Sequence, residues 1–434
     1  MIDLDREMRA LLEEDAQHTP PVPEPTPVLR RTRRRQIGVA LATVAVFAAV
    51  ALGSVAGVSA LVRSSERRVP IGPNVTTSPS TTPVTPMPTG TVAGLLPAVV
   101  GGSGLEGLTA ERFPGLRAVG ELAAAPDGTV WAIGWGGAAS PLDSVSHFDG
   151  EEWTSFPVED LPVAGWLRSV GVGPGGTVWV GTEKGLARFD GDGWTQVGPK
   201  VSLRQIAVAS DGSIVVGYGG TRGGAELSGE GAVARVDDQT WTPLWDEHTS
   251  LPDHFEDFVE FVAVSPLDGS VWMTSCGCGH TFFPEGTISR FDGERWTTWV
   301  MDDVLGRFAE SSPAGSYVPR AITFAPDGSL WVMTHLGDAT ESGVGALLRT
   351  DGQGWSAYEL PARLATDWEG ALAVDTNGRL WAARSGGRTL YSFNGTSWTQ
   401  DDLGEGIQAL AVAPDGALWL AVEGSLVRYA PSST

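Results

Sequence analysis

Apolar and polar residues follow one recurring order from Ala118 to the end of the chain. Each repeat has an apolar run, then Asp-Gly or a variant, and then, three residues after the glycine, a Trp or in the third repeat a Val. The glycines are Gly128, Gly176, Gly212, Gly269, Gly328, Gly378 and Gly416, and the residues three places later are Trp131, Trp179, Val215, Trp272, Trp331, Trp381 and Trp419. Short apolar runs bounded by Asp-Gly turns predict antiparallel strands.

A second series of tryptophans interleaves with the first. Its members are Trp153, Trp194, Trp241, Trp296, Trp355 and Trp398. Together the series predict four strands per repeat; in the second repeat these strands are 167–173, 177–181, 185–189 and 194–197. Seven such repeats predict an all-β fold, a seven-bladed β-propeller over residues 105–434, with both tryptophan series packed between blades.

The last repeat lacks the fourth strand that the other repeats have. After Trp419 and Tyr429 no final Trp-Thr strand follows. The segment 108–116 precedes the first blade in the place of a fourth strand, so we expect it to complete the seventh blade and close the ring. Closure removes an exposed sheet edge.

An uncharged apolar run covers residues 37–62. At a rise of 1.5 Å per residue it is long enough to cross a hydrocarbon core of roughly 30 Å, so it predicts one transmembrane helix. Five arginines precede it and three follow it: Arg30, Arg31, Arg33, Arg34 and Arg35, then Arg63, Arg67 and Arg68. This bias predicts a plasma-membrane protein with a cytoplasmic tail of residues 1–36 and an extracellular propeller. A cleaved secretory signal, processed near Ala60, is the competing interpretation.

Residues 63–104 are rich in Pro, Thr and Ser and predict a disordered stalk. The tail before the membrane has a short amphipathic pattern at residues 2–12, followed by a Pro-rich spacer and the arginines. This arrangement resembles the N-terminal part of actinobacterial membrane proteins of the anti-sigma type. The resemblance implies a cytoplasmic sigma factor as partner, although the segment has only His18 and no Cys for the zinc motif of many such domains.

The repeat motifs also resemble a known family. The stretches 410–419 (LAVAPDGALW) and 185–191 (GLARFDG) are similar to the two-component-regulator propeller repeat of bacterial sensor regions. They are also similar to the propellers of virginiamycin B lyase and of lactonases. The resemblance implies the fold over residues 108–430; no lyase or lactonase catalytic set matches residue by residue, and no kinase portion is present.

The formal net charge is −23, and the acidic excess lies after the apolar run. Residues 63–434 carry 22 Lys and Arg against 45 Asp and Glu. Such a surface does not neutralise phosphates, so a nucleic-acid partner is disfavoured.

The longest insertions all lie on one face of the predicted propeller. Links from the second to the third strand, and from the fourth strand to the next blade, share this insertion face, whereas the Asp-Gly turns lie on the opposite turn face. The insertions cover 135–144, 218–231, 276–286 and 335–345 within blades, and 243–257, 298–319 and 356–369 between blades. Variable loops on a rigid scaffold are typical binding surfaces.

Histidines and tryptophans outside the two series gather on the insertion face. The candidate ligand-binding residues are His248, His254, His280, His335, Trp135, Trp166, Trp245, Trp299 and Trp368. Cys276, Cys278 and His280 form one compact group that has the ligand types of a zinc or copper site. A disulfide between the two cysteines, or two thiols without a role, are the alternatives.

Three classes of function fit this organisation. The first is an extracellular module that binds or senses a ligand, such as a glycan, a wall polymer or a protein, and is coupled to the cytoplasmic tail. The second is a cell-surface hydrolase or lyase that uses a histidine of the insertion face. The third is a structural envelope protein. We favour binding over enzymatic activity, because the sequence has no nucleophile elbow, paired ligand motif or phosphate loop and no catalytic residue can be assigned.

Overall fold

A computed structural model describes residues 95–96, 98, 100–115, 119–134, 144–218, 232–237, 240–244, 259–275, 286–306, 317–336, 345–352, 354–365 and 370–431. The chain divides into two units, 1–80 and 81–434, and all described residues belong to the second. The predicted tail, transmembrane helix and most of the predicted stalk lie outside them. Among the described residues, no helix is long and apolar enough to span a membrane.

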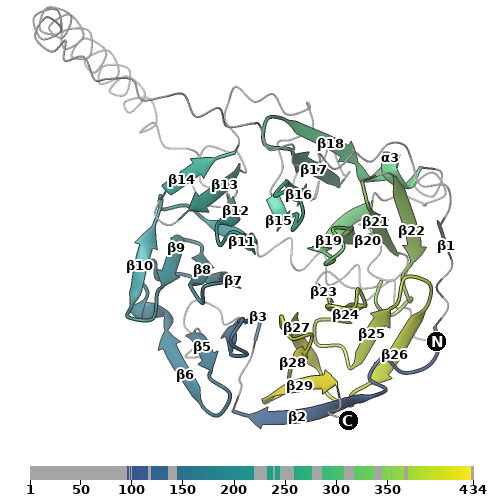
Figure 1. Ribbon diagram of the computed structural model, residues 1–434, viewed down its shortest axis with the longest axis horizontal. Coiled ribbons are helices and arrows are strands. Elements are labelled where there is room, and N and C mark those ends of the chain that lie inside the picture. The colour runs from purple at the N-terminus through teal and green to yellow at the C-terminus, as the bar shows by residue number, and fades with distance from the viewer. Residues whose placement is uncertain are drawn as a thin grey trace, which may run out of the picture. The chain divides into compact units, whose positions relative to one another are not determined.

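Seven sheets surround one axis, as the repeats predict (Figure 1). Blade 1 contains β3 (Glu121–Ala124), β4 (Val130–Ile133), β5 (Ser144–Phe148) and β6 (Trp153–Pro157). Blade 2 contains β7 (Leu167–Val172), β8 (Val178–Thr182), β9 (Gly185–Phe189) and β10 (Trp194–Val197). Blade 3 contains β11 (Leu203–Val208), β12 (Ile214–Tyr218), β13 (Ala232–Asp237) and β14 (Thr240–Pro243). A 3₁₀ turn, η1 (Val158–Asp160), follows β6.

Blades 4 to 6 continue the same order. Blade 4 contains β15 (Val259–Val264), β16 (Val271–Ser275), β17 (Thr287–Phe291) and β18 (Trp296–Val300). Blade 5 contains β19 (Tyr317–Phe324), β20 (Leu330–Leu336), β21 (Gly345–Thr350) and β22 (Trp355–Glu359). Blade 6 contains β23 (Gly370–Val374), β24 (Leu380–Arg384), β25 (Thr389–Phe393) and β26 (Trp398–Asp402). One helical turn, α3 (Met301–Leu305), follows β18. Within each blade the four strands are antiparallel and in chain order.

Blade 7 closes the ring with a strand from the N-terminal side of the propeller. It contains β27 (Ile407–Val412), β28 (Leu418–Val422), β29 (Ser425–Pro431) and, outermost, β2 (Leu108–Pro114). Figure 1 shows β2 along the outer side of β29. The predicted closure by segment 108–116 is therefore confirmed, and the strand covers the edge that β29 would otherwise expose.

The segment before β2 lies along the outer edges of blades 5 and 6, and we call its described residues between 95 and 107 the strap. Its first part, β1 (Leu95–Leu96), pairs in parallel with β22. The amide of Gly101 donates to the carbonyl of Trp398 at 2.9 Å, and the amide of Gly104 donates to Asp401 Oδ2 at 2.9 Å. The described residues of this segment up to Gly104, which the sequence assigns to the stalk, thus add hydrogen bonds from their main chain to two blades.

The tryptophans pack between blades. All six on second strands are at most 5 % exposed. The indole of Trp131 in blade 1 meets Phe189 of blade 2 at 5.6 Å, and Trp331 of blade 5 meets Phe393 of blade 6 at 5.9 Å. Because each core cluster joins two neighbouring blades, the ring has seven seams and no single central core.

Candidate functional site

Only three of the nine candidate residues lie among the described residues: His335, Trp166 and Trp299. His248, His254, His280, Trp135, Trp245 and Trp368 lie outside them, as do Cys276 and Cys278. The metal and disulfide hypotheses therefore stay predictions. Within the described ranges, no group of three His, Cys, Asp or Glu side chains is arranged to hold a metal ion.

Trp299 packs in a seam. It lies on β18, its ring stacks on Trp272 at 5.6 Å with an interplanar angle of 10°, and it meets Trp355 of blade 5 edge-on at 6.2 Å. This third tryptophan near the outer part of blade 4 thus extends the aromatic contact between blades 4 and 5.

His335 is buried at the insertion-face end of β20, with 5 % exposed surface. Its Nε2 lies 2.8 Å from Nη2 of Arg320, which is buried on the neighbouring strand β19. Burial lowers the pKa of Arg320 to about 10, although the charge of Glu260 opposes this shift. The guanidinium remains charged at neutral pH, and it holds the imidazole in place as a hydrogen-bond acceptor.

Trp166 is the one tryptophan among the described residues that is exposed, with 43 % of its surface in water. It ends the link from blade 1 to blade 2, just before β7. Leu161 and Val163 of the same link are each 3 % exposed and belong to the core cluster between these blades. The buried anchors fix the link to the scaffold, so the indole is presented from a rigid segment.

The turn between β8 and β9 supports this link from the side. The Glu183 amide donates to the Trp166 carbonyl at 3.1 Å. The buried hydroxyl of Thr182 donates to the Val163 carbonyl at 2.8 Å, and the Lys184 amide donates to that hydroxyl at 3.0 Å. The side chains of Glu183 and of the exposed Lys184 both lie near Gly165, the residue before Trp166, on the insertion face.

Arg168 lies against the exposed indole. It is the second residue of β7, where the pairing register shifts between Leu167 and Ser169, and its guanidinium carbon lies 5.5 Å from the centroid of the Trp166 ring. A β-bulge redirects the extra side chain away from the regular ladder. Four other innermost strands shift register at the same position, where the extra residues are Arg204, Glu260, Arg320 and Gln408.

Polar side chains link neighbouring innermost strands just inside these bulges. Glu121 of β3 accepts from the Ser169 hydroxyl at 3.1 Å and from the Val170 amide at 3.3 Å. Ser169 in turn accepts from the Ile206 amide at 3.1 Å. Burial raises the pKa of Glu121 to about 8, against the opposing effect of these hydrogen bonds. This carboxyl is therefore mostly protonated at neutral pH.

The turn face carries a different set of arginine–tryptophan pairs. Arg290, Arg349 and Arg428 lie over Trp272, Trp331 and Trp419 at 5.8, 5.4 and 5.8 Å. Each of these arginines also pairs with the Asp of its own turn: Asp268 at 2.9 Å, Asp327 at 3.2 Å and Asp415 at 2.8 Å. The repeated sequence motif thus forms an indole, a guanidinium and a carboxylate in contact.

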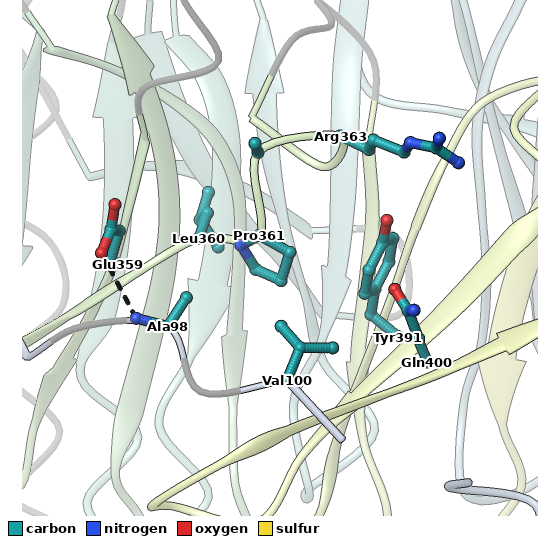
Figure 2. Close-up of a pocket in the computed structure, with 9 residues that line it drawn as sticks. Ala98, Val100, Glu359, Leu360, Pro361, Arg363, Tyr391 and Gln400 are labelled. Carbon is teal, nitrogen blue, oxygen red and sulfur yellow. Dashed lines mark hydrogen bonds between the residues drawn. The ribbon is translucent and has the colours of Figure 1, made fainter. Parts of the chain in front are cut away.

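A shallow pocket of about 490 Å³ lies at the outer rim, under the strap. Figure 2 shows Val100 on its strap side, Tyr391 and Arg363 at one end, and the hydrogen bond from the Ala98 amide to Glu359 at the other. None of the nine candidate residues lines this pocket. It forms where the strap meets the link between blades 5 and 6, which is part of the insertion 356–369.

Sequence reasoning found Trp166 but missed Arg168 and Lys184. Histidines and tryptophans that interrupt the repeats stand out in the sequence, whereas arginines inside predicted strands do not. The available signal is positional, because Arg168 and Arg204 occupy the second place of a first strand and Arg320 lies at the equivalent register shift of β19.

No protein-family model matches the chain, and no curated protein matches it significantly. Several solved structures share its fold. One is a streptogramin B lyase, at 15 % identity and a TM-score of 0.54, covering 76 % of this chain and 99 % of the lyase. A catalytically inactive virginiamycin B lyase from Staphylococcus aureus with quinupristin has 16 % identity and a TM-score of 0.53, covering 74 % and 99 %.

A third similar structure is PorZ, a surface component of the type-IX secretion system of Porphyromonas gingivalis. It has 18 % identity and a TM-score of 0.51, and the match covers 74 % of this chain and 47 % of PorZ. At these identities the likeness shows the propeller fold and no shared activity.

Proposed function

We propose that the protein is a membrane-anchored, extracellular propeller that binds a ligand on its insertion face and reports it to a cytoplasmic tail. The observation that carries the binding role is the exposed Trp166 with Arg168 against it, held by buried residues of the link and of blade 2. An exposed aromatic on a rigid segment is typical of a binding surface. The anchor and tail rest on the apolar run 37–62 and the arginines before it.

The hydrolase or lyase alternative has less support from the described residues. His335 is 5 % exposed, and its ring nitrogen is occupied by Arg320. A general base needs access to the substrate proton.

A thermal-shift screen on the full-length protein tests the binding role. Glycans, wall polymers, peptides and metal ions are screened one class at a time. We expect at least one class to raise the melting temperature, and the shift to vanish in Trp166→Ala but persist in Leu267→Ala, an exposed apolar residue of the turn face at 61 %. No shift with any class, or equal loss in both variants, would contradict a binding role for this face.

The membrane arrangement and the tail need separate tests. Protease added to intact cells should release the propeller by cleaving within residues 63–94, while the remaining fragment stays in the membrane fraction. Co-purification of a sigma factor that is lost when residues 1–29 are deleted would support coupling. Retention of the propeller inside cells would contradict the orientation.

A further inference from the structure

Arg168 differs in its polar partners from the arginines that lie over tryptophan on the turn face. Arg379, over Trp381 at 5.6 Å, donates to the Gly104 carbonyl at 2.7 Å. Arg290, Arg349 and Arg428 each have a carboxylate within 3.2 Å. Within the described residues, the Arg168 guanidinium makes no ion pair and no hydrogen bond, and its only contact of this kind is the Trp166 ring. Its Nε is buried without a hydrogen-bond partner, so the terminal Nη groups are the donors available to an external acceptor.

Arg168 and Lys184 place two positively charged side chains around Trp166 in a chain with a net charge of −23, although Glu183 lies in the same turn as Lys184. Lys184 is exposed, and its side chain lies near Gly165, the residue before Trp166. Two carboxyl groups are near: Glu183 in the β8–β9 turn and Glu121 beside Ser169. Glu121 is mostly neutral at pH 7 because burial raises its pKa, so it does not cancel the charge of Arg168.

The combination restricts the chemistry of the ligand. A flat indole surface suits the apolar face of a ring, and a guanidinium suits a carboxylate or phosphate, which it binds through two parallel hydrogen bonds. Trp166 lies on an open surface, with 43 % exposed. A sugar ring can stack there and keep its hydroxyl groups in water, whereas an aliphatic side chain would remain largely solvated.

We propose that Trp166, Arg168 and Lys184 form a site for an acidic carbohydrate, that is, a sugar bearing a carboxylate or a phosphate. The ring stacks on Trp166, Arg168 binds the anion, and Lys184 adds a second positive charge. This inference rests on the proposed binding role of the insertion face and specifies its ligand. Nucleic acid is a poor alternative because the acidic propeller repels a long polyanion.

Isothermal titration of the full-length protein tests the site with three probes: an oligosaccharide of glucuronic acid, the neutral oligosaccharide of glucose of the same length, and glucose 6-phosphate. We expect either acidic probe to bind about tenfold more tightly than the neutral one, and its affinity to fall as salt rises. The stronger of the two acidic probes identifies carboxylate or phosphate as the preferred anion.

The variants separate stacking from charge. Arg168→Gln and Trp166→Ala should each weaken acidic-sugar binding by about tenfold or more, and Arg168→Lys should recover only part of it because Lys lacks the planar fork. Matched controls on the turn face are Arg295→Gln, whose side chain is 78 % exposed, and Leu267→Ala. Both should bind as the wild type does.

The outcomes distinguish the two proposals. Equal affinity for neutral and acidic sugars, no sugar binding, or acidic-sugar binding that Arg168→Gln leaves unchanged would overturn the acidic-carbohydrate site. If another class of ligand then binds in a Trp166-dependent way, the binding role of the insertion face survives. If no ligand of any class binds, both proposals fall.

Discussion

The two faces of the propeller use the same pair of side chains for opposite purposes. On the turn face, Arg290 lies over the buried Trp272 and pairs with Asp268, and both members of the ion pair are nearly inaccessible, at 3 % and 10 %. On the insertion face, Arg168 lies against the exposed Trp166 and forms no ion pair with a carboxylate of the described residues. The comparison teaches that an arginine–tryptophan contact is structural where a carboxylate completes it and burial excludes water. Where both are missing, the same contact is free to serve a ligand.

The largest expected difference concerns the tryptophans themselves. Trp272→Ala should lower the free energy of unfolding by about 3–5 kcal/mol, because it empties a seam between blades 4 and 5. Trp166→Ala should change it by less than about 0.5 kcal/mol. Thermal and urea unfolding of the full-length variants measure both. Similar losses in the two variants would mean that Trp166 is a packing residue.

The arginines should differ by a smaller margin. Arg290→Gln leaves the buried Asp268 carboxylate without its main partner, which costs about 3 kcal/mol for a buried pair. Arg168→Gln removes no carboxylate contact, so its unfolding free energy should stay within about 0.5 kcal/mol of the wild type. The same unfolding assays apply, and a large loss in Arg168→Gln would reveal a structural role.

Carboxyl groups on the two sides should also respond oppositely to pH. Partial burial of Asp327 on the turn face acts to raise its pKa. The Ser329 hydrogen bonds and the charge of Arg349 outweigh this effect and lower the pKa. Glu121 has a pKa of about 8, so the folded protein keeps a proton that the unfolded chain releases above about pH 4.5. Stability therefore falls as pH rises from about 4.5 to 8.

Glu121→Gln cannot ionise and should remove this loss. We expect the variant to be more stable than the wild type at pH 8 by at least about 1 kcal/mol, and the two proteins to converge below pH 4.5. Melting temperatures measured across this range check the sign. Curves that stay parallel at every pH would show that Glu121 ionises in the folded protein as it does in the unfolded one.

The smallest effect is expected in blade 1, where His147 occupies the place of the stacked arginine. It stacks on Trp131 at 4.3 Å, with Asp127 close enough to interact electrostatically. Burial lowers the pKa of His147 although Asp127 and Asp149 oppose this, so stability should fall slightly as pH drops through about 6.5.

His147→Arg should remove this pH dependence and change stability at pH 7 by no more than about 0.5 kcal/mol. Melting curves at pH 5 and pH 7 are the measurement. A large loss at pH 7 would show that blade 1 has no room for the guanidinium that blades 2, 4, 5 and 7 accept.

The repeats predict the propeller well because the fold depends on the same contacts in every blade. The second blade illustrates this: strands predicted at 185–189 and 194–197 match β9 and β10. The closing strand is predictable because a ring of four-stranded blades leaves one strand to be supplied. The strap could not be predicted, because Gly101 and Gly104 bind blade 6 through main-chain amides and need no apolar pattern.

The candidate site is predictable only in part. Trp166 and Trp299 are alike in sequence, since both interrupt the tryptophan series, yet one is exposed and the other stacks on Trp272. Their difference depends on which neighbouring blade covers each ring, and no local pattern records it. The role of Arg168 depends on the absence of an Asp beside it, which follows from its position at a bulge rather than opposite an Asp-Gly turn.

Closure by β2 also sets an order of events during synthesis. Glu111 on β2 and Arg428 on β29 form an ion pair although 317 residues separate them in the sequence, so these two strands leave the ribosome at very different times. The ring therefore stays open until the last repeat has emerged, however early the first blades form. A chain that ends within that repeat presents an open sheet edge, which marks it for chaperones and proteases.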